Sequence, residues 1–274
     1  MTGRIPLAGV VGSPVGHSKS PTLHGHWLKQ YGLPGHYVPL HIEADDFESV
    51  IRTLPKAGFV GVNVTVPHKI RALDIADTSS KFAERIGAAN MLTFRPDGTI
   101  YAENSDSYGF LAHLKQSAPD WRSQDGPVLV LGAGGAARAV VAALIEDGAT
   151  DVVIANRTAS AAEDIASVAN CSTVDWSDVG SIIEEMQTIV NTTSLGMTGM
   201  PPLPMNLSGL PAGQTVMDLV YAPPETELLA RARQAGCTAV DGLGMLLHQA
   251  VPGFERWFGV MPEVDAELRR AVLG

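Results

Sequence analysis

Cysteine is scarce in this 274-residue chain, since Cys171 and Cys237 are the only two. They lie far apart and form no CxxC pair, which excludes a disulfide framework and a zinc-binding pattern. Long apolar runs are also missing. The best candidate, 128–145, is interrupted by three glycines and Arg138, whereas a membrane-spanning helix needs about 18 apolar residues. The first residues lack the charged start and apolar core of a signal peptide. We therefore expect a cytoplasmic protein that does not contact membranes.

Basic residues are few: 19 Lys and Arg stand against 29 Asp and Glu, for a net charge of −10. An acidic surface repels phosphate backbones, so nucleic acid is a poor candidate partner. Hydrophobic residues make up 45% and charged residues 18%, a balance that excludes long-range disorder. Net charge describes the outer surface, however, and does not exclude small anionic ligands that are held by a few local groups.

Short apolar strands alternate with helical segments along the chain, a pattern typical of α/β domains with parallel strands. At about 150 residues per domain, the length fits two modest domains, and the polar stretch Ser117–Pro127 is the predicted connection. The sequence Arg95-Pro-Asp-Gly98 is typical of a turn and predicts a hairpin. The tail, 243–273, is predicted to form two helices that separate near Gly259 and Pro262. We expect two α/β halves with a cleft between them.

The expected elements can be given by residue range. Strands are predicted at 5–11, 36–42, 60–66, 90–94, 99–102, 128–131, 152–155, 188–191, 216–219 and 238–240. Helices are predicted at about 21–31, 45–56 and 105–116, with further helices ending near 76, 147 and 169.

A glycine-rich turn follows the strand predicted at 128–131. Gly132-Ala133-Gly134-Gly135-Ala136-Ala137 fits the pattern G-x-G-x-x-A between a buried strand and a helix. The first glycine permits a tight turn, the second lets the backbone approach a pyrophosphate, and Ala137 permits close helix packing. The helix start then offers free N–H groups to phosphate. Glycine alone is weak evidence, since any tight turn can use it, but this context predicts a dinucleotide site.

The end of the next strand distinguishes between cofactors. An NAD enzyme usually carries an acidic residue about 20 residues after the glycine turn, where it binds the ribose 2′-hydroxyl. Here the sequence is Asn156-Arg157-Thr158. No carboxylate would repel a 2′-phosphate, and Arg157 can pair with one. Thr158 can also serve as an ordinary helix N-cap beside a solvated arginine. The sequence favours NADP.

Lys69 follows the strand predicted at 60–66, in the stretch Asn63-Val-Thr65-Val-Pro67-His-Lys69. Pro67 ends the strand and suits the first turn of a helix, where the helix dipole disfavours a cation. A solvated surface lysine is the commonest case. The carboxyl end of a parallel strand is, however, where α/β sheets bind ligands. Lys69 is therefore a candidate general acid and base.

Two other polar segments are candidates for the same site. Asp106 stands just before a helix, where a capping role is ordinary, or it pairs with Lys69 for proton transfer. Ser18 and Ser20 lie on a loop after the first strand. Ser20 before Pro21 fits an N-cap followed by the first helical residue, and two hydroxyls on such a loop could also hold a polyhydroxylated ligand.

Taken together, these motifs resemble shikimate dehydrogenase over nearly the whole chain. The resemblance rests on many ordered matches, which are Gly16-His-Ser18-Lys-Ser20-Pro21, Asn63 to Lys69, Gly87-Ala-Ala-Asn90, Asn104-Ser-Asp106-x-x-Gly109, Gly132 to Arg138, Asn156-Arg157-Thr158, Asn191-Thr-Thr-Ser-Leu-Gly196-Met197, Asp218-Leu-Val-Tyr221 and Gly242-Leu-Gly-Met245-Leu-Leu-His-Gln249-Ala. It implies the reversible NADP-dependent reduction of 3-dehydroshikimate to shikimate, in aromatic amino-acid biosynthesis.

The resemblance also implies an architecture. It comprises an α/β substrate domain, 1–104, and a Rossmann-like NADP-binding domain, 105–241. Residues 242–274 return as helices to the first domain. The protein would be a monomer or a homodimer that acts on a small molecule.

Roles for individual residues are implied by position. The catalytic couple would be Lys69 and Asp106. The substrate's hydroxyls and carboxylate would be held by Ser18, Ser20, Thr65, Asn90, Asp106, Tyr221 and Gln249. The pyrophosphate would be held by Gly132, Ala133, Gly134, Gly135 and Ala136, and the adenosine side by Asn156, Arg157 and Thr158. Gly242 and Met245 would lie near the nicotinamide. No metal site is expected.

The chain departs from the family pattern at a few positions. Where the family often carries a second basic residue, three positions after Thr158, this chain has Ala161, so one cation fewer would face the 2′-phosphate. Ser105 replaces a usual threonine, and Ser194 a usual proline. Three alternatives stay open: a quinate-preferring paralogue with relaxed use of NAD or NADP, a different reductase such as a methylenetetrahydrofolate dehydrogenase, and a non-enzymatic dinucleotide sensor.

Overall fold

The computed structural model describes residues 5–204 and 209–274. The chain divides into two compact units, each with its own sheet. The first unit comprises Met1–Ser105 and Leu247–Gly274, and the second comprises Asp106–Leu246. The division after 246 falls within helix α10 (Gly242–His248). The sequence placed its two boundaries at 104/105 and 241/242, with all of α10 in the first domain.

The sheet of the first unit is mixed, with strand order β2-β1-β3-β5-β6-β4. Its strands are β1 (Leu7–Gly12), β2 (His36–His41), β3 (Phe59–Val64), β4 (Thr78–Ser79), β5 (Met91–Phe94) and β6 (Ile100–Glu103). Strand β1 pairs in parallel with β2 and β3, whereas β5 pairs antiparallel with β3 and β6. The predicted hairpin is confirmed as β5 and β6. The sequence did not predict the short β4.

Helices cover both faces of this sheet. In the part of the first unit before Ser105, they are α1 (Ser20–Gln30), α2 (Phe47–Ile51), the 3-10 turn η1 (Leu54–Ala57), α3 (Lys69–Asp74) and α4 (Lys81–Ile86). Phe47, Ile51 and Ala72 pack with Val62 and Val64 of β3 on one face. The segment predicted as a single helix at 45–56 is broken, because Pro55 lacks the N–H that a continuous helix needs.

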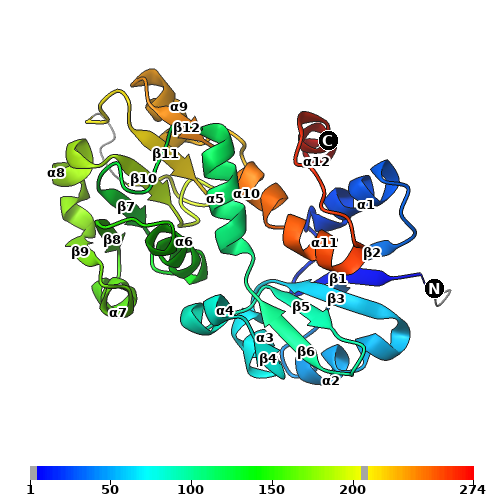
Figure 1. The fold of residues 1–274 in the computed structure, drawn as a ribbon. Coiled ribbons are helices and arrows are strands. Elements are labelled where there is room, and N and C mark those ends of the chain that lie inside the picture. Colours follow the sequence, from blue (N-terminus) through cyan, green and yellow to red (C-terminus); the bar gives the residue numbers. More distant parts are fainter. Residues whose placement is uncertain (1–4, 205–208) are drawn as a thin grey trace. The chain divides into compact units, whose positions relative to one another are not determined.

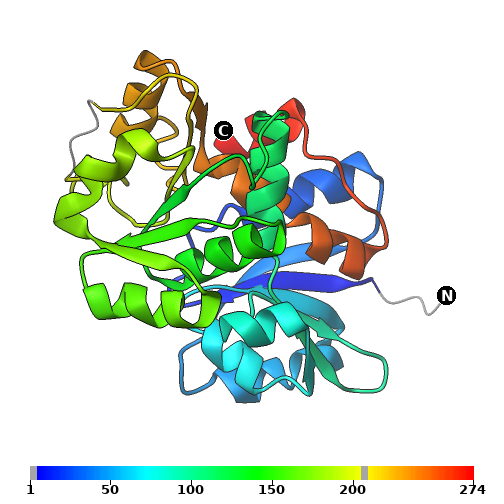
Figure 2. The same cartoon turned by 60° about the vertical axis from the view of Figure 1, so that its left-hand side comes forward.

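The C-terminal helices cover the other face, beside α1. Helices α11 (Val251–Phe258) and α12 (Ala266–Leu273) follow α10, and α11 contacts β3 and β5 while α12 contacts α1. Figures 1 and 2 both show these orange and red helices beside the blue α1. The prediction of two tail helices was wrong. The part before Gly259 forms two helices, α10 and α11, since Pro252 fits only the first turn of a new helix.

The sheet of the second unit is entirely parallel, with strand order β12-β11-β10-β7-β8-β9. Its strands are β7 (Val128–Leu131), β8 (Val152–Asn156), β9 (Ser172–Asp175), β10 (Thr188–Asn191), β11 (Thr215–Asp218) and β12 (Thr238–Val240). Read from β9, this is the order 3-2-1-4-5-6 of a Rossmann fold. Successive strands are added on one side of β7 up to β9 and on its other side from β10 onward, so the strand order reverses between β7 and β10. Ligands of such sheets bind at the carboxyl ends of the strands beside that reversal.

Helices also cover both faces of the second sheet, labelled in Figure 1. They are α5 (Asp106–Ser117), α6 (Gly135–Glu146), α7 (Ala159–Ala169), the 3-10 turns η2 (Trp176–Asp178) and η3 (Ile183–Glu185), α8 (Val179–Ile182) and α9 (Glu227–Gln234). Val128 and Val130 face α5, α6 and α7, whereas Leu129 and Leu131 face α8 and α9. Because both faces of β7 are covered, its sequence is apolar at every position.

Candidate active site

Two loops of the first unit are joined at the carboxyl ends of β1 and β3. The Thr65 N–H donates to the Val11 carbonyl (2.8 Å), and the Ser13 N–H donates to the Val66 carbonyl (3.1 Å). Gly12 permits this approach, because a Cβ there would lie 2.5 Å from Thr65 Cγ2. The structure thus places Thr65 beside the start of the loop that carries Ser18 and Ser20.

The end of β3 differs from the prediction. The strand ends at Val64, two residues before the predicted end, and Val66 is 69% exposed. Pro67 has no N–H with which to continue the sheet, and it precedes α3 rather than lying within it. Residue His68 occupies the N-cap position and Lys69 begins the helix.

The backbone of Lys69 is held on both sides. His68 is buried, its Nε2 lies 2.7 Å from the Ile42 carbonyl, and its ring stacks on Phe47 with centroids 4.5 Å apart. The Lys69 carbonyl accepts a hydrogen bond from the Ala89 N–H (2.8 Å). Lys69 itself is half-buried. These contacts fix the backbone from which the Lys69 side chain extends, and they join it to the segment that ends in Asn90.

Asn90 is buried, and its side chain joins two motifs of the sequence. Its Oδ1 accepts hydrogen bonds from the N–H (2.8 Å) and hydroxyl (3.2 Å) of Ser105. In parallel, Asn104 Nδ2 donates to the Ala88 carbonyl (3.1 Å). Segments 87–90 and 104–105 are therefore tied together, and the next residue along the chain, Asp106, begins α5.

Ser18 and Ser20 are joined by a local hydrogen bond, from the Ser20 N–H to Ser18 Oγ (3.3 Å). The sequence predicted Ser20 as the N-cap of α1, but Lys19 occupies that position and Ser20 is the first helical residue. Ser20 is buried, at 5% exposure, and Ser18 is half-buried. The N-cap of α1 makes no side-chain hydrogen bond to the helix start.

The remaining predicted substrate residues are placed separately. Gln249 belongs to the first unit, between α10 and α11, and is half-buried. Asp106 and Tyr221 belong to the second unit, where Tyr221 is 36% exposed. Their roles beside Lys69 therefore stay predictions. Sequence reasoning omitted Asn63, which donates to the Asn90 carbonyl through Nδ2 (3.3 Å). The signal was its position two residues before Thr65, on the same face of the strand predicted at 60–66.

In the second unit, the glycine turn leaves open space at the start of α6. Gly132 has φ +111°, and a Cβ there would lie 2.6 Å from Thr192 Oγ1. Gly134 is the N-cap of α6 and makes no side-chain capping bond, and a Cβ on Gly134 or Gly135 would meet nothing within 4 Å. An uncapped helix start with open space before it fits a pyrophosphate.

Asn156, Arg157 and Thr158 lie at the end of β8, the strand next to β7. Leu131 pairs with Ala155, so the two segments lie side by side at the same edge of the sheet. Asn156 Nδ2 donates to the Thr158 carbonyl (2.9 Å), and Thr158 is the N-cap of α7 without a side-chain bond. Arg157 is exposed. An exposed guanidinium beside the glycine turn fits a 2′-phosphate.

Two further residues predicted for the cofactor have clear packing roles. A Cβ on Gly242 would lie 2.2 Å from the Leu219 carbonyl oxygen, so only glycine permits this contact. Met245 is 9% exposed and packs in the core of the second unit. Their place near the nicotinamide stays a prediction.

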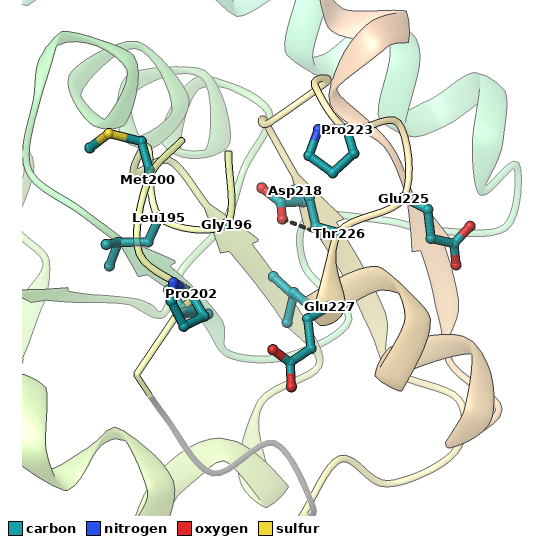
Figure 3. A pocket seen from close by; sticks show the side chains of 11 residues that line it. Leu195, Gly196, Met200, Pro202, Asp218, Pro223, Glu225, Thr226 and Glu227 are labelled. Atoms are coloured by element: carbon teal, nitrogen blue, oxygen red, sulfur yellow. Dashed lines mark hydrogen bonds between the residues drawn. The ribbon is translucent and has the colours of Figure 1, made fainter. Parts of the chain in front are cut away.

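A pocket of about 260 Å³ lies in the second unit and is lined by Leu195, Gly196, Asp218 and Thr226 among others (Figure 3). Asp218 accepts hydrogen bonds from Asn191 Nδ2 (2.9 Å), the Val220 N–H (3.0 Å) and Thr226 Oγ1 (2.6 Å). Burial raises the pKa of Asp218, and these hydrogen bonds oppose that rise. Asp218 thus joins the ends of β10 and β11 to the start of α9. None of the predicted site residues lines this pocket.

Two kinds of feature are absent from residues 5–204 and 209–274. No helix there is long and apolar enough to cross a membrane. No group of three or more His, Cys, Asp or Glu side chains there could hold a metal ion.

Three family models match successive parts of the chain. Residues 10–92 match the shikimate dehydrogenase substrate binding domain, residues 113–197 match shikimate / quinate 5-dehydrogenase, and residues 242–271 match the shikimate 5'-dehydrogenase C-terminal domain. The chain belongs to the shikimate dehydrogenase family. A relative from Ruegeria sp., named shikimate dehydrogenase (NADP(+)), is 56% identical over 272 residues, covering 98% of this chain and 99% of its own.

Solved structures of the family share the fold. A shikimate 5-dehydrogenase from Thermus thermophilus, in complex with NADP(H) and shikimate, superposes with a TM-score of 0.87 at 33% identity, covering 97% of this chain and 98% of its own. A quinate dehydrogenase from Corynebacterium glutamicum, in complex with NAD, gives 0.91 at 30% identity, with coverage of 97% and 98%. The predicted two-part fold, with its Rossmann-like NADP-binding unit, is confirmed.

Proposed function

We propose that this protein catalyses the reversible NADPH-dependent reduction of 3-dehydroshikimate to shikimate, a step of aromatic amino-acid biosynthesis. The observation that carries this proposal is the 56% identity to a shikimate dehydrogenase (NADP(+)) over 98% of the chain. Several further relatives at 54–56% identity carry the same name. The protein is an NADP-dependent oxidoreductase of this family.

In this proposal, residues 1–104 and 242–274 form the substrate domain, and 105–241 the NADP-binding domain. The substrate's hydroxyls and carboxylate are held by Ser18, Ser20, Thr65, Asn90, Asp106, Tyr221 and Gln249. The hydrogen bonds among Thr65, Asn90 and their neighbours support this assignment, because a ligand with several hydroxyls needs fixed donors and acceptors in a fixed arrangement.

Lys69 and Asp106 are the proposed acid and base. In the reducing direction, the Lys69 ammonium donates a proton to the oxygen of the substrate ketone, and in the oxidising direction its amine accepts the proton of the hydroxyl. Asp106 orients the ammonium and balances its charge. The fixed root of the lysine, bonded through its carbonyl to Ala89, supports this role, since proton transfer requires a defined donor position.

Gly132, Ala133, Gly134, Gly135 and Ala136 would hold the pyrophosphate of NADP, and Asn156, Arg157 and Thr158 its adenosine side with the 2′-phosphate. Gly242 and Met245 would lie near the nicotinamide. When bound, the cofactor supplies the hydride. The protein supplies its orientation, through the open helix start of α6 and the exposed guanidinium of Arg157.

The proposal extends to partners and location. The partners are small molecules, not nucleic acid or a membrane. We propose a cytoplasmic monomer or homodimer, in keeping with a biosynthetic role that uses soluble substrates.

A direct assay tests the function. Purified protein receives shikimate or quinate, each with NADP⁺ or NAD⁺, and the absorbance of the reduced nicotinamide is followed. We expect the highest kcat/KM with shikimate and NADP⁺. Faster turnover of quinate than of shikimate would show that quinate is the preferred substrate. This comparison is needed because the related quinate dehydrogenase has a very similar fold. No turnover with any pair would contradict an enzymatic role.

A further inference from the structure

Two buried polar side chains of the first unit bond to each other beneath α1 and α11. Tyr37 of β2 is 7% exposed and Asn63 of β3 is 5% exposed. The Tyr37 hydroxyl donates to Asn63 Oδ1 across 2.7 Å. Neither residue was predicted as part of the site. Burying two polar side chains costs free energy of folding unless they are hydrogen-bonded. The hydrogen-bond partners of Tyr37 and Asn63 therefore indicate the role of the pair.

The sheet register explains how Tyr37 reaches Asn63. Strand β1 lies between them, with Ala8 beside Tyr37 and Val10 beside Asn63. The small side chain of Ala8, fully buried in the same cluster, leaves room for the phenol to extend across β1. On its other side, the phenol ring stacks on His24 of α1, with centroids 3.8 Å apart and planes at 3°. Packing therefore fixes the plane of the ring.

The hydroxyl of Tyr37 in turn fixes the Asn63 amide. Because Oδ1 accepts from Tyr37, the amide nitrogen of Asn63 is directed at the Asn90 carbonyl, 3.3 Å away. The Val64 N–H donates to that same carbonyl (2.8 Å). A flipped amide would place Oδ1 against the Asn90 carbonyl oxygen, so that two acceptors would meet without a proton between them. The Asn90 carbonyl thus selects one orientation, and the Tyr37 hydroxyl stabilises it by donating to Oδ1.

The network continues at both ends to residues of the proposed substrate site. At one end, burial raises the pKa of Tyr37, and the Ser20 side chain opposes that rise as a hydrogen-bond partner. At the other end, Asn90 Oδ1 accepts both hydrogen bonds from Ser105. Tyr37 is therefore a side-chain link between the start of α1, which carries Ser20, and the Asn90 segment, far apart along the chain.

We propose that Tyr37 is a positioning residue for shikimate, which orients Asn63 and thereby holds Asn90 and Ser20 in the arrangement that binds the substrate. It acts through these residues, without touching the ligand. The inference rests on the proposed function of the same site. It predicts that loss of the Tyr37 hydroxyl weakens shikimate binding and leaves NADP⁺ binding unchanged.

The test compares Tyr37→Phe with a matched control, Tyr31→Phe. Tyr37→Phe keeps the ring and its stack on His24 but removes the hydroxyl. Tyr31 is half-buried in the same unit, and its hydroxyl accepts a hydrogen bond from the Glu263 N–H (3.0 Å), outside the network. Both changes remove one bonded hydroxyl, so a general loss of stability would affect both variants.

For each variant, Kd for shikimate is measured by calorimetry, and KM for shikimate and for NADP⁺ by steady-state kinetics. We expect Tyr37→Phe to raise Kd and KM for shikimate about tenfold, the usual effect of an unpaired buried polar group, with KM for NADP⁺ unchanged. Tyr31→Phe should leave all three constants near the wild-type values. Wild-type affinity for shikimate in folded Tyr37→Phe would overturn the inference, as would a fall in kcat alone.

A second variant, Asn63→Asp, serves if Tyr37→Phe does not fold. The carboxylate still accepts from Tyr37 but has no N–H for the Asn90 carbonyl. We expect the same selective loss of shikimate affinity, with partial recovery at lower pH as the carboxyl protonates and regains a donor. Normal shikimate binding by this variant would refute the positioning role. If the wild-type protein itself neither binds nor oxidises shikimate, the proposed function fails instead.

Discussion

The imidazole of His24 stacks on the phenol ring of Tyr37, with ring centroids 3.8 Å apart. Trp27 and Phe254 lie within 5.8 Å of the same imidazole, centroid to centroid. Neither ring nitrogen has a hydrogen-bond partner within the described part of the chain. Burial in these surroundings lowers the pKa of His24 to about 3, so His24 packs as a neutral aromatic side chain.

This burial predicts a pH-dependent stability. The unfolded chain protonates His24 near pH 6.5, whereas the folded protein does so only near pH 3. Between these values the unfolded state binds one proton more, so the free energy of unfolding falls as pH falls, by up to about 1.4 kcal/mol per pH unit. Urea unfolding at pH 7 and pH 5 should show a decrease in the wild type that is about 2 kcal/mol larger than in His24→Phe. Equal decreases would show that His24 does not contribute.

Lys69→Ala should lower kcat for shikimate oxidation by roughly 10²–10⁴-fold, the usual contribution of a general acid or base. The free energy of unfolding should change little, because the Lys69 carbonyl keeps its bond to Ala89 in the variant. Lys56→Ala is the matched control, since Lys56 is an exposed lysine of the same unit, in η1. A near-normal kcat in Lys69→Ala would exclude the proposed role.

Gly132→Ala and Gly134→Ala should separate folding from cofactor binding. Gly132 has φ +111°, and a Cβ would clash with Thr192, so Gly132→Ala should destabilise the second unit by about 1–3 kcal/mol. A Cβ on Gly134 meets open space. Gly134→Ala should therefore melt near the wild-type temperature but raise KM for NADP⁺. Thermal unfolding without cofactor, together with kinetics, checks both, and unchanged NADP⁺ kinetics in Gly134→Ala would contradict the assigned pyrophosphate site.

Arg157 and Ala161 together should set the choice between NADP⁺ and NAD⁺. Arg157→Ala removes the exposed guanidinium and should raise KM for NADP⁺ about tenfold, the effect of one lost charge-assisted contact, while KM for NAD⁺ changes little. Ala161→Arg adds a cation to the first turn of α7, and it should lower KM for NADP⁺. If both variants change the two constants in parallel, the 2′-phosphate is bound elsewhere.

Five of the six strands in each sheet could be predicted from the sequence. Strand β7 was predicted at its exact bounds, 128–131, because a buried parallel strand is an unbroken apolar run between polar segments. Strands β4 and β9 were missed. Each is short and largely exposed, so neither carries an apolar pattern. In the tail, Gln249 and Ala250 separate α10 from α11 without a glycine or proline of their own. The signal for this break was Pro252, in the first turn of α11.

In the candidate site, too, some features could be predicted from the sequence and others could not. Motifs of neighbouring residues, such as Gly132–Ala137 or Asn63–Lys69, can be recognised because their spacing is local. The bond from Tyr37 to Asn63 could not be predicted, since it depends on the register of two strands on either side of β1 and on the small side chain of Ala8. Sequence patterns show which residues face a core, but not which buried polar groups meet there.

The return of the C-terminal helices to the first unit has a consequence for folding during synthesis of the chain. Helix α11 supplies Phe254 and Trp257, which pack beside His24 and Tyr37. A ribosome releases residues 106–246 before these two aromatic residues. The unit that is begun first is thus completed last, and its sheet must wait for α11 while the nucleotide-binding unit has its whole sequence available to fold.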